Sequence, residues 1–327
     1  MNAFEYIRPV DEADALRALA EPDTAALAGG TTLVDLMRLS VMQPKRVVDL
    51  GELKLDAIEV NGNAITIGAL ATNTAVADHP AIKARFPALA EAIDAGASGQ
   101  IRNMASVGGN LLQRTRCTYF RDTASPCNKR EPGSGCSAID GYTRMHAVIG
   151  GSRDCIAVHP SDMCVALLAL DAVIHVKSAA GGERVLPFVD LHTLPADKPQ
   201  IETTLQPGEL ITSVELRDSG FSKHSRYVKV RDRASFAFAL ASAAVALDVR
   251  GGIIAAARVA LGGVATKPWR EHDVEAQLVG KHISKDGFAG AAAVALRGAE
   301  PRPDNAFKLE LAKRVIARAL ELAGGLS

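Results

Sequence analysis

The sequence predicts an α+β chain with two domains, one spanning residues 1–220 and the other residues 221–327. Strand and helix patterns alternate over the first 55 residues, which is typical of a small α/β unit. Strand patterns with hairpin turns follow, and the last third predicts three strands and then helices. A length of 327 residues with 48% apolar residues is sufficient for two hydrophobic cores.

The first subdomain, residues 1–55, is expected to contain a small parallel sheet. Asp11 precedes a run of helix-forming residues and predicts the N-cap of the first helix. The strands are predicted at residues 4–10, 24–28 and 45–51, with helices at 11–21 and 32–41.

The second subdomain, residues 56–220, is also expected to mix strands and helices. Asn61-Gly62 lies between two alternating strand patterns and predicts a hairpin. A long irregular stretch, residues 113–155, interrupts this subdomain and is called the cysteine segment below. The other predicted elements are a helix at 80–95, a strand at 155–158, a helix from Ser161, and strands at 171–176 and 206–216.

The second domain begins after a polar stretch, residues 217–225, that predicts the domain boundary. Its three predicted strands are expected to form an antiparallel sheet with helices behind it. The last predicted helix, residues 305–324, repeats apolar side chains on one face. The strands are predicted at residues 226–233, 236–249 and 253–265.

Charge and hydropathy exclude several kinds of partner. Lys plus Arg and Asp plus Glu number 37 each, so the chain lacks the charge excess of a nucleic-acid-binding protein. No apolar run is long enough to span a bilayer, and we expect no membrane insertion. The first residues, MNAFEYIRPVDEAD, lack the basic and apolar regions of a signal peptide.

Two glycine-containing turns are candidate phosphate sites. In LAGGTTLVD, Gly29 and Gly30 allow positive φ and close backbone approach before a helix, with Thr32 and Asp35 as its predicted capping residues. A plain strand-to-helix turn is the competing interpretation, and the motif is not the G-x-G-x-x-G of a Rossmann fold. In SVGGNLL, Ser106 and the residues Gly108, Gly109 and Asn110 form a second small, polar turn that could admit a pyrophosphate, although a plain loop is the simpler interpretation.

Asp162 opens the helix predicted from Ser161. Its side chain can cap the helix or accept a hydrogen bond from a ligand hydroxyl, and as an isolated residue the cap is the simpler interpretation.

The cysteine segment contains four of the five cysteines: Cys117, Cys127, Cys136 and Cys155. Nine, eight and eighteen residues separate them. Such a long loop has too few apolar groups to offset an ordering cost on the order of 1 kcal/mol per residue, so it needs a covalent or coordinate staple. The fifth, Cys164, lies among apolar residues and is expected to be a buried structural thiol.

Three staples compete. Disulfides need an oxidising compartment, and zinc usually takes closely spaced C-x₂₋₄-C pairs. An iron–sulfur cluster tolerates wide spacing. The segment also carries seven Lys/Arg against four Asp/Glu, which favours an anionic cluster. The cluster is therefore preferred, with zinc, disulfides and free thiols kept as alternatives.

Taken together and in this order, the glycine turns, Asp162 and the cysteine segment resemble the FAD-binding subunit of the molybdenum hydroxylases, the xanthine dehydrogenase family. The resemblance covers the whole chain and implies a FAD-binding domain of the vanillyl-alcohol-oxidase type followed by a C-terminal flavoprotein domain. The stretch QRTRCTYFRDTASPCNKREPGSGCSAI is similar to the subunits of bacterial periplasmic aldehyde oxidoreductases that carry an additional [4Fe–4S] cluster.

The resemblance implies roles for individual residues. Asp162 would hydrogen-bond FAD, Ile211 and Lys229 would lie against the flavin, and Ser106, Gly109 and Asn110 would stand beside its phosphates. The metal ligands would be Cys117, Cys127, Cys136 and Cys155. The FAD pyrophosphate would lie in the turn formed by Ala25, Ala26, Leu27, Ala28, Gly29, Gly30, Thr31, Thr32 and Leu33.

The implied function is electron transfer within a heterotrimeric molybdenum aldehyde oxidoreductase. A large partner subunit would hold the molybdenum–pterin centre, and a small partner would hold [2Fe–2S] clusters. FAD, bound noncovalently, would deliver electrons to an external acceptor. We assign no catalytic acid, base or nucleophile, because neither H-E-x-x-H nor G-x-S-x-G occurs. Of the histidines, only His159 is considered as a donor near the cluster; the other seven are expected to be surface or core residues.

Two other functions remain as alternatives: a zinc-stapled binding module and a stand-alone flavin oxidase. The expected location is the periplasm, reached by export with a partner that carries a signal, or the cytoplasm.

Overall fold

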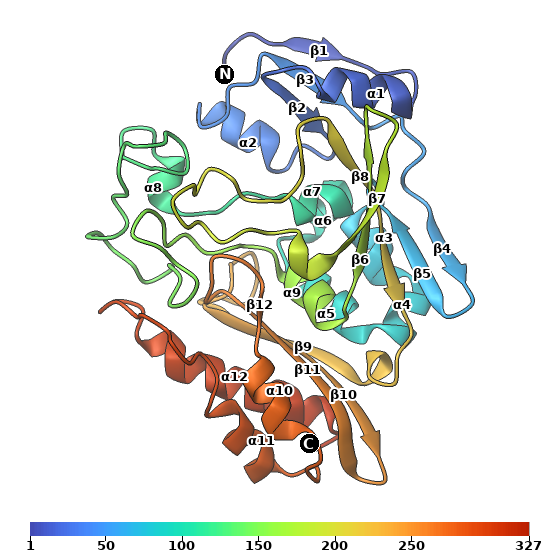
Figure 1. Ribbon diagram of the computed structural model, residues 1–327, viewed down its shortest axis with the longest axis vertical. Helices are drawn as coiled ribbons and strands as arrows, with labels where there is room; N and C mark the ends of the chain where they lie inside the picture. Colours follow the sequence, from blue (N-terminus) through green and yellow to red (C-terminus); the bar gives the residue numbers. More distant parts are fainter. Residues whose placement is uncertain (327) are drawn as a thin grey trace.

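The computed structural model describes residues 1–326, which form three parts stacked along the long axis of the molecule (Figure 1). The first part is a three-stranded parallel sheet with the strand order β1-β3-β2 and two helices. Asp11 caps α1 by accepting a hydrogen bond from the Asp14 N–H at 2.8 Å, as predicted. Its elements are β1 (Glu5–Ile7), α1 (Glu12–Leu19), β2 (Thr24–Leu27), α2 (Leu33–Arg38) and β3 (Arg46–Asp49).

The middle part is built on a five-stranded antiparallel sheet with the order β4-β5-β8-β6-β7. The predicted hairpin at Asn61-Gly62 joins β4 to β5. The strands are β4 (Ile58–Asn61), β5 (Ala64–Gly68), β6 (Val173–Ser178), β7 (Glu183–Pro187) and β8 (Glu209–Arg217). The helices are α3 (Asn73–Asp78), α4 (Pro80–Arg85), α5 (Pro87–Ala95), α6 (Gly99–Met104), α7 (Val107–Leu111), α8 (Thr118–Arg121), α9 (Asp162–Ala169) and the 3₁₀ turn η1 (Phe188–Asp190).

The third part is an antiparallel sheet backed by helices, as expected, but it has a fourth strand. The short β12 pairs with β11, and its two residues are too few for a sequence pattern. The elements are the 3₁₀ turn η2 (Ser222–His224), β9 (Ser225–Val230), β10 (Ala241–Arg250), β11 (Ile253–Gly262), β12 (Trp269–Arg270), α10 (His272–Leu278), α11 (Lys285–Ala292) and α12 (Phe307–Ala323).

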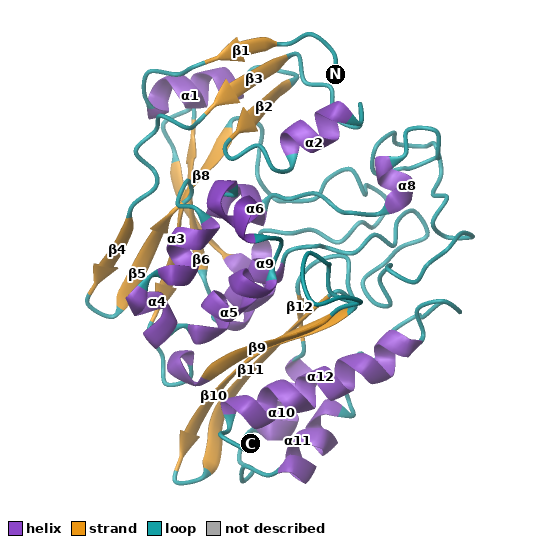
Figure 2. Cartoon of the chain, turned by 180° about the vertical axis from the view of Figure 1, so that it is seen from behind, coloured by secondary structure: helices purple, strands orange, loops and turns teal. Residues whose placement is uncertain are grey.

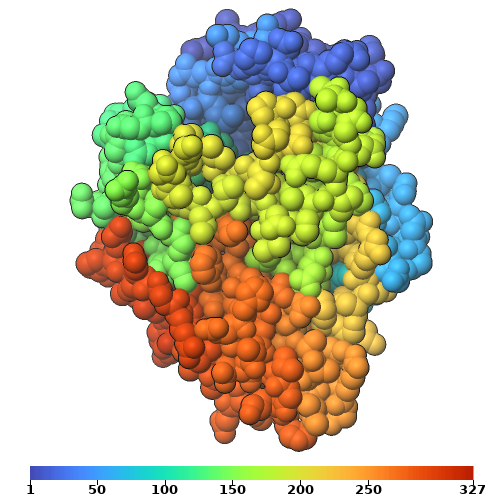
Figure 3. Space-filling model, in the orientation of Figure 1, coloured from blue at the N-terminus to red at the C-terminus, as the bar shows by residue number. Residues whose placement is uncertain are grey.

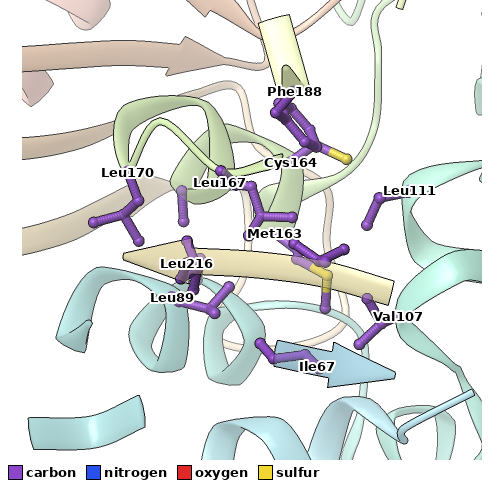
Figure 4. Close-up of a cluster of buried hydrophobic side chains, with 14 of the residues drawn as sticks. Ile67, Leu89, Val107, Leu111, Met163, Cys164, Leu167, Leu170, Phe188 and Leu216 are labelled. Carbon is purple, nitrogen blue, oxygen red and sulfur yellow. The ribbon is translucent and has the colours of Figure 1, made fainter. Parts of the chain in front are cut away.

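Helix α9 is the centre of the main hydrophobic core. Every residue from Met163 to Ala169 is buried, which is the pattern of a helix enclosed on all sides. Figure 4 shows its side chains between α5, strand β8 and Phe188. Cys164 is 0% exposed within this core, so the prediction that this thiol is buried is confirmed.

The cysteine segment lies between the first and third parts and consists of loops apart from α8 (Figure 2). In the space-filling view its green atoms lie at one side of the molecule, between the blue N-terminal part and the red C-terminal part (Figure 3). None of the helices within residues 1–326 has both the length and the apolarity needed to cross a bilayer.

Three predicted elements differ from the structure. The helix predicted at 80–95 breaks at Phe86, because Pro87 excludes the helical conformation from the residue before it. Residues 155–158 form no strand; they are held by isolated loop hydrogen bonds such as that from the Ala147 N–H to the Ile156 carbonyl. The strand predicted from residue 236 begins at Ala241.

Candidate functional site

The three parts and the cysteine segment meet around one large cavity of about 1030 Å³, called the central cavity here. The cavity is lined by Thr31, Thr32 and Asp35 from the first part and by Lys229 from the third. The middle part contributes α5, α6, α7 and the start of α9. The cavity is therefore formed by segments that lie between residues 31 and 238 of the chain.

The first glycine turn packs against the backbone of the middle part. A Cβ atom on Gly29 would lie 1.7 Å from the carbonyl oxygen of Met104, so only glycine fits there. Gly30 has φ +72°, the left-handed conformation that glycine adopts without strain. Both reasons given for these glycines, close approach and positive φ, are confirmed, one at each residue.

The capping predicted for α2 is wrong. Thr32 occupies the N-cap position, but its side chain makes no capping hydrogen bond. Instead its hydroxyl accepts from Arg116 at 3.4 Å, and Asp35 pairs with Arg116 at 3.1 Å and with Arg121 at 2.8 Å. Because of the hydrogen bond from Arg121, the pKa of Asp35 is held below its usual value. These arginines come from the cysteine segment, and both line the central cavity.

The second glycine turn forms the N-terminus of α7. Ser106 is the N-cap, and its hydroxyl accepts a hydrogen bond from the Gly109 N–H at 3.2 Å. Asn110 is fixed by hydrogen bonds to its Oδ1 from Ser161 at 2.6 Å and from Gln113 at 2.7 Å. Gly109 and Asn110 line the cavity, whereas Ser106 is buried behind them.

Asp162 does not cap its helix, because Ser161 is the N-cap of α9. Its carboxylate accepts from Lys229 Nζ at 2.7 Å and from the Tyr227 hydroxyl at 2.5 Å. Burial raises the pKa of Tyr227 well above its usual value, so this hydroxyl stays protonated and donates. The side chains of Asp162 and Lys229 are 9% and 3% exposed, so α9 and β9 are joined by a nearly buried ion pair at the cavity wall.

The FAD residues implied by the resemblance are only partly on the cavity wall. Thr31, Thr32, Gly109, Asn110, Asp162 and Lys229 line the cavity. Residues 25–27 lie in strand β2, and Ala28, Gly29, Gly30 and Leu33 form the turn and the start of α2 behind that wall. Ile211 is 2% exposed within the core, on β8.

The four cysteines of the cysteine segment are free thiols, and they lie near enough to one another for their charges to interact. The backbones of Cys127 and Cys136 form an isolated antiparallel β-bridge. Burial, with a smaller contribution from the neighbouring cysteines, raises the pKa of Cys117 to about 12 and that of Cys155 to about 11. The pKa of Cys136 is raised by burial in the same way. Metal binding at these thiols therefore requires the release of protons.

Backbone N–H groups point at the sulfur atoms and oppose this rise. Those of Tyr119 and Phe120 face the Cys117 sulfur, and that of Ala157 lies 3.5 Å from the Cys155 sulfur. Such N–H groups stabilise thiolate ligands of a metal centre. Four free cysteines, two of them with backbone N–H groups at the sulfur atom, form a donor set that fits a metal centre.

The charge argument for a cluster is corrected by the structure. Most basic side chains of the cysteine segment pair with carboxylates outside it, not with the sulfur atoms. Arg114 and Lys129 pair with Glu202, Arg116 and Arg121 with Asp35, and Arg144 with Asp232. These pairs fasten the segment to the rest of the molecule, and thiolate charge is compensated by backbone amides at Cys117 and by Lys129 together with a backbone amide at Cys155.

Two histidines differ from expectation. His159 Nε2 lies 3.1 Å from His192 Nε2, and its Nδ1 accepts a hydrogen bond from the Ser161 N–H at 3.4 Å, so both ring nitrogens have partners other than Cys155. His146, expected to be an ordinary surface or core residue, has its Nε2 3.2 Å from the Cys117 sulfur. Twenty-eight residues separate His146 from Cys117, with no periodicity to relate them, so the sequence carries no signal for this contact.

The sequence matches known protein families along most of its length. Residues 2–216 match the family described as FAD binding domain in molybdopterin dehydrogenase, and residues 226–323 match the CO dehydrogenase flavoprotein C-terminal domain. The chain is 47% identical to the aldehyde oxidoreductase FAD-binding subunit PaoB of Escherichia coli, over 98% of both chains. It is 29% identical to the glyceraldehyde dehydrogenase medium chain of Sulfolobus acidocaldarius, over 86% of this chain and 83% of that one.

Solved structures show the same fold. Quinoline 2-oxidoreductase of Pseudomonas putida 86 superposes with a TM-score of 0.77 and 26% identity, covering 99% of this chain and 98% of that chain. Carbon monoxide dehydrogenase of Hydrogenophaga pseudoflava gives 0.77 and 25%, with the same coverage. The predicted fold class is confirmed.

Proposed function

Because the chain belongs to the FAD-binding subunits of the molybdopterin dehydrogenases, we propose that it binds FAD in the central cavity and a [4Fe–4S] cluster at the cysteine segment. It is an oxidoreductase subunit of a molybdenum-dependent dehydrogenase complex. When bound, these two cofactors supply one- and two-electron transfer. The chain's own residues bind and orient them.

The central cavity fits FAD in size and in chemistry. Its volume of about 1030 Å³ suits a large cofactor, since ligand sites usually measure about 300–1,000 Å³. The close contact of Gly29 with Met104 brings the glycine turn against the middle part, and Arg116 and Arg121 supply positive charge beside it. These groups would hold the pyrophosphate, and Asp162 would accept a hydrogen bond from a hydroxyl of the cofactor.

One observation carries the proposal that a single subunit holds both cofactors. Arg116 lines the central cavity, and the next residue, Cys117, is one of the four cysteines of the cysteine segment. At the other end of the cysteine segment, Asp162 at the cavity wall lies seven positions after Cys155 in the sequence. Two short stretches of chain therefore link the cysteine site to the cavity.

We further propose the assembly in which this subunit works. A large molybdopterin subunit would oxidise the aldehyde, a small [2Fe–2S] subunit would relay the electrons, and this subunit would pass them to an external acceptor. The proposal is supported by the 47% identity to an aldehyde oxidoreductase subunit. The proposed location is the periplasm, through export together with a signal-bearing partner, or the cytoplasm.

A Cys127→Ala variant tests the cluster. Cys127 is 7% exposed and packs with Leu36 of α2 and Phe120 of α8, so losing the metal there should loosen the cysteine segment. We expect loss of iron, lower FAD occupancy and weaker assembly with the partner subunits. The proposal fails if all three measurements match those of the unaltered protein.

The two alternative functions predict different results. A zinc-stapled module would contain one zinc per chain and show no iron–sulfur absorption. A stand-alone flavin oxidase would turn over aldehyde as an isolated chain, whereas a subunit of a larger complex would not.

A further inference from the structure

His146 joins the cysteine segment to the C-terminal helix α12. Its Nε2 lies 3.2 Å from the Cys117 sulfur, within hydrogen-bonding range for sulfur, and the residue is 4% exposed. Both residues line a second cavity of about 260 Å³ that adjoins the central cavity and shares Arg116 and Asp162 with it. The contact is thus sheltered and lies beside the proposed FAD site.

The backbone of His146 is fixed from outside the cysteine segment. Its carbonyl oxygen accepts hydrogen bonds from Lys308 Nζ at 3.0 Å and from Asn305 Nδ2 at 3.3 Å. Lys308 and Asn305 are both 0% exposed, and Lys308 also donates to the Gly263 carbonyl at 2.7 Å. The imidazole is therefore placed by the third part of the molecule.

The position of the imidazole proton follows from the partner. A metal-bound thiolate only accepts hydrogen bonds, so the nitrogen beside it must be the donor. Within residues 1–326, Nδ1 of His146 is buried without a hydrogen-bond partner. If the proton is on Nε2, the buried Nδ1 is an acceptor without a partner. If the proton were on Nδ1, a buried N–H donor would have no partner. The Nε2–H tautomer accounts for both nitrogens.

We propose that His146 is a positioning residue that donates its Nε2–H to the Cys117 sulfur and raises the reduction potential of the metal centre bound there. An N–H donor stabilises negative charge on the sulfur, and the reduced cluster carries one more negative charge than the oxidised one. The inference rests on the proposed [4Fe–4S] cluster and assigns it a tuning residue that comes from outside the four ligands.

Redox titration of the purified complex tests the tuning. Leucine at position 146 fills the site without a donor, whereas glutamine keeps an N–H group. We expect His146→Leu to lower the midpoint potential of the cluster. His146→Gln should keep the potential close to that of the unaltered protein. His272→Leu is the matched control, because His272 is exposed on α10 and should leave the potential unchanged. An iron-loaded His146→Leu protein with the unaltered potential would overturn the inference.

A measurement on unaltered protein covers the case in which His146→Leu does not fold. Protein carrying ¹⁵N-labelled histidine is reduced, and electron spin echo modulation of the cluster signal reports any histidine nitrogen coupled to it. We expect coupling to one histidine nitrogen. Iron-loaded protein without this coupling overturns the inference alone, whereas unaltered protein without iron overturns the proposed function and the inference together.

Discussion

Asp35 is the residue at which the cysteine segment is fastened to the proposed FAD site. Its carboxylate accepts from Arg116 and Arg121, two residues that flank Cys117 in the sequence. All three side chains line the central cavity. The same arginines can therefore hold the segment in place and attract the phosphates of a bound cofactor.

Replacing Arg121 tests this double role. In Arg121→Leu, a positive charge beside the cavity is lost and the Asp35 carboxylate keeps only one partner, so phosphate binding becomes less favourable. We expect the dissociation constant for FAD to rise roughly tenfold, about 1.4 kcal/mol. Flavin fluorescence during titration of the apoprotein measures it.

The matched control is Arg314→Leu. Arg314 is exposed on α12 and pairs with Glu310 four residues before it, so its loss should not alter FAD binding. Equal dissociation constants for Arg121→Leu and the control would show that Arg121 does not contribute to the cofactor site.

At the scale of elements, the first glycine turn makes a steric prediction. A Cβ on Gly29 would collide with the Met104 carbonyl, so Gly29→Ala must push the first part away from α6. We expect a loss of about 1–3 kcal/mol in the free energy of unfolding, together with weaker FAD binding. Thermal unfolding and flavin titration provide the two readouts.

Gly99→Ala provides the comparison. A Cβ on Gly99 would meet nothing within 4 Å, and the residue lies at the start of α6, where alanine is tolerated. Its stability should equal or exceed that of the unaltered protein. If Gly29→Ala were equally harmless, the close packing of this turn would not matter.

Local patterns predicted most elements, and the errors have local physical causes. Asn61-Gly62 predicted its hairpin, and Asp11 predicted its cap, because both signals act within a few residues. Pro87 broke a helix that apolar periodicity alone had extended. The stretch after residue 236 resembles a strand in composition, but Phe236 and Phe238 are 53% and 42% exposed at the mouth of the cavity.

The site residues that belong to a recognisable sequence motif could be predicted from the sequence. The four cysteines and the glycine turn were found from the sequence. Contacts across long chain distances, such as His146 with Cys117 and Tyr227 with Asp162, have no sequence signal because they depend on how α12 and β9 pack.

Glu271, at the start of α10, predicts a pH dependence of stability. Burial raises its pKa from the ordinary 4.5 to about 7, and its carboxylate accepts from the Leu296 N–H at 3.1 Å. Between these pH values the folded protein holds a proton that the unfolded chain has lost, so stability falls as the pH rises from 4.5 to 7. Glu271→Gln should remove this slope.

At pH 8 the Glu271→Gln variant should be more stable than the unaltered protein, by on the order of 2 kcal/mol. Denaturant unfolding between pH 4.5 and pH 8 measures the effect, with Glu310→Gln on the surface of α12 as the control. Parallel pH profiles for Glu271→Gln and the unaltered protein would contradict the assignment.

At the scale of the whole molecule, the cysteine segment connects the proposed metal site to the central cavity. It contacts α2 through Asp35, the middle part through Glu202 and the third part through Asp304, which accepts from the Thr143 N–H at 3.0 Å. Ordering of this one loop therefore affects every part that lines the central cavity.

Metal removal is expected to release the flavin. Without the metal, no coordinate bonds offset the conformational entropy that the cysteine segment loses when it is ordered. Arg116 and Arg121 should then lose their fixed positions. We predict that oxidative removal of iron in the presence of a chelator lowers FAD affinity at least tenfold, as measured by fluorescence of released flavin. Flavin retained at full affinity by iron-free protein would show that the two sites are independent.

The central claim is that one chain holds both cofactors, and cofactor analysis of the purified complex tests it most directly. Flavin, iron, acid-labile sulfide and zinc are measured per copy of this subunit. The account predicts one FAD, four iron atoms and four sulfides, in agreement with the four cysteine ligands. Zinc in place of iron, or four titratable thiols with no metal, would contradict it.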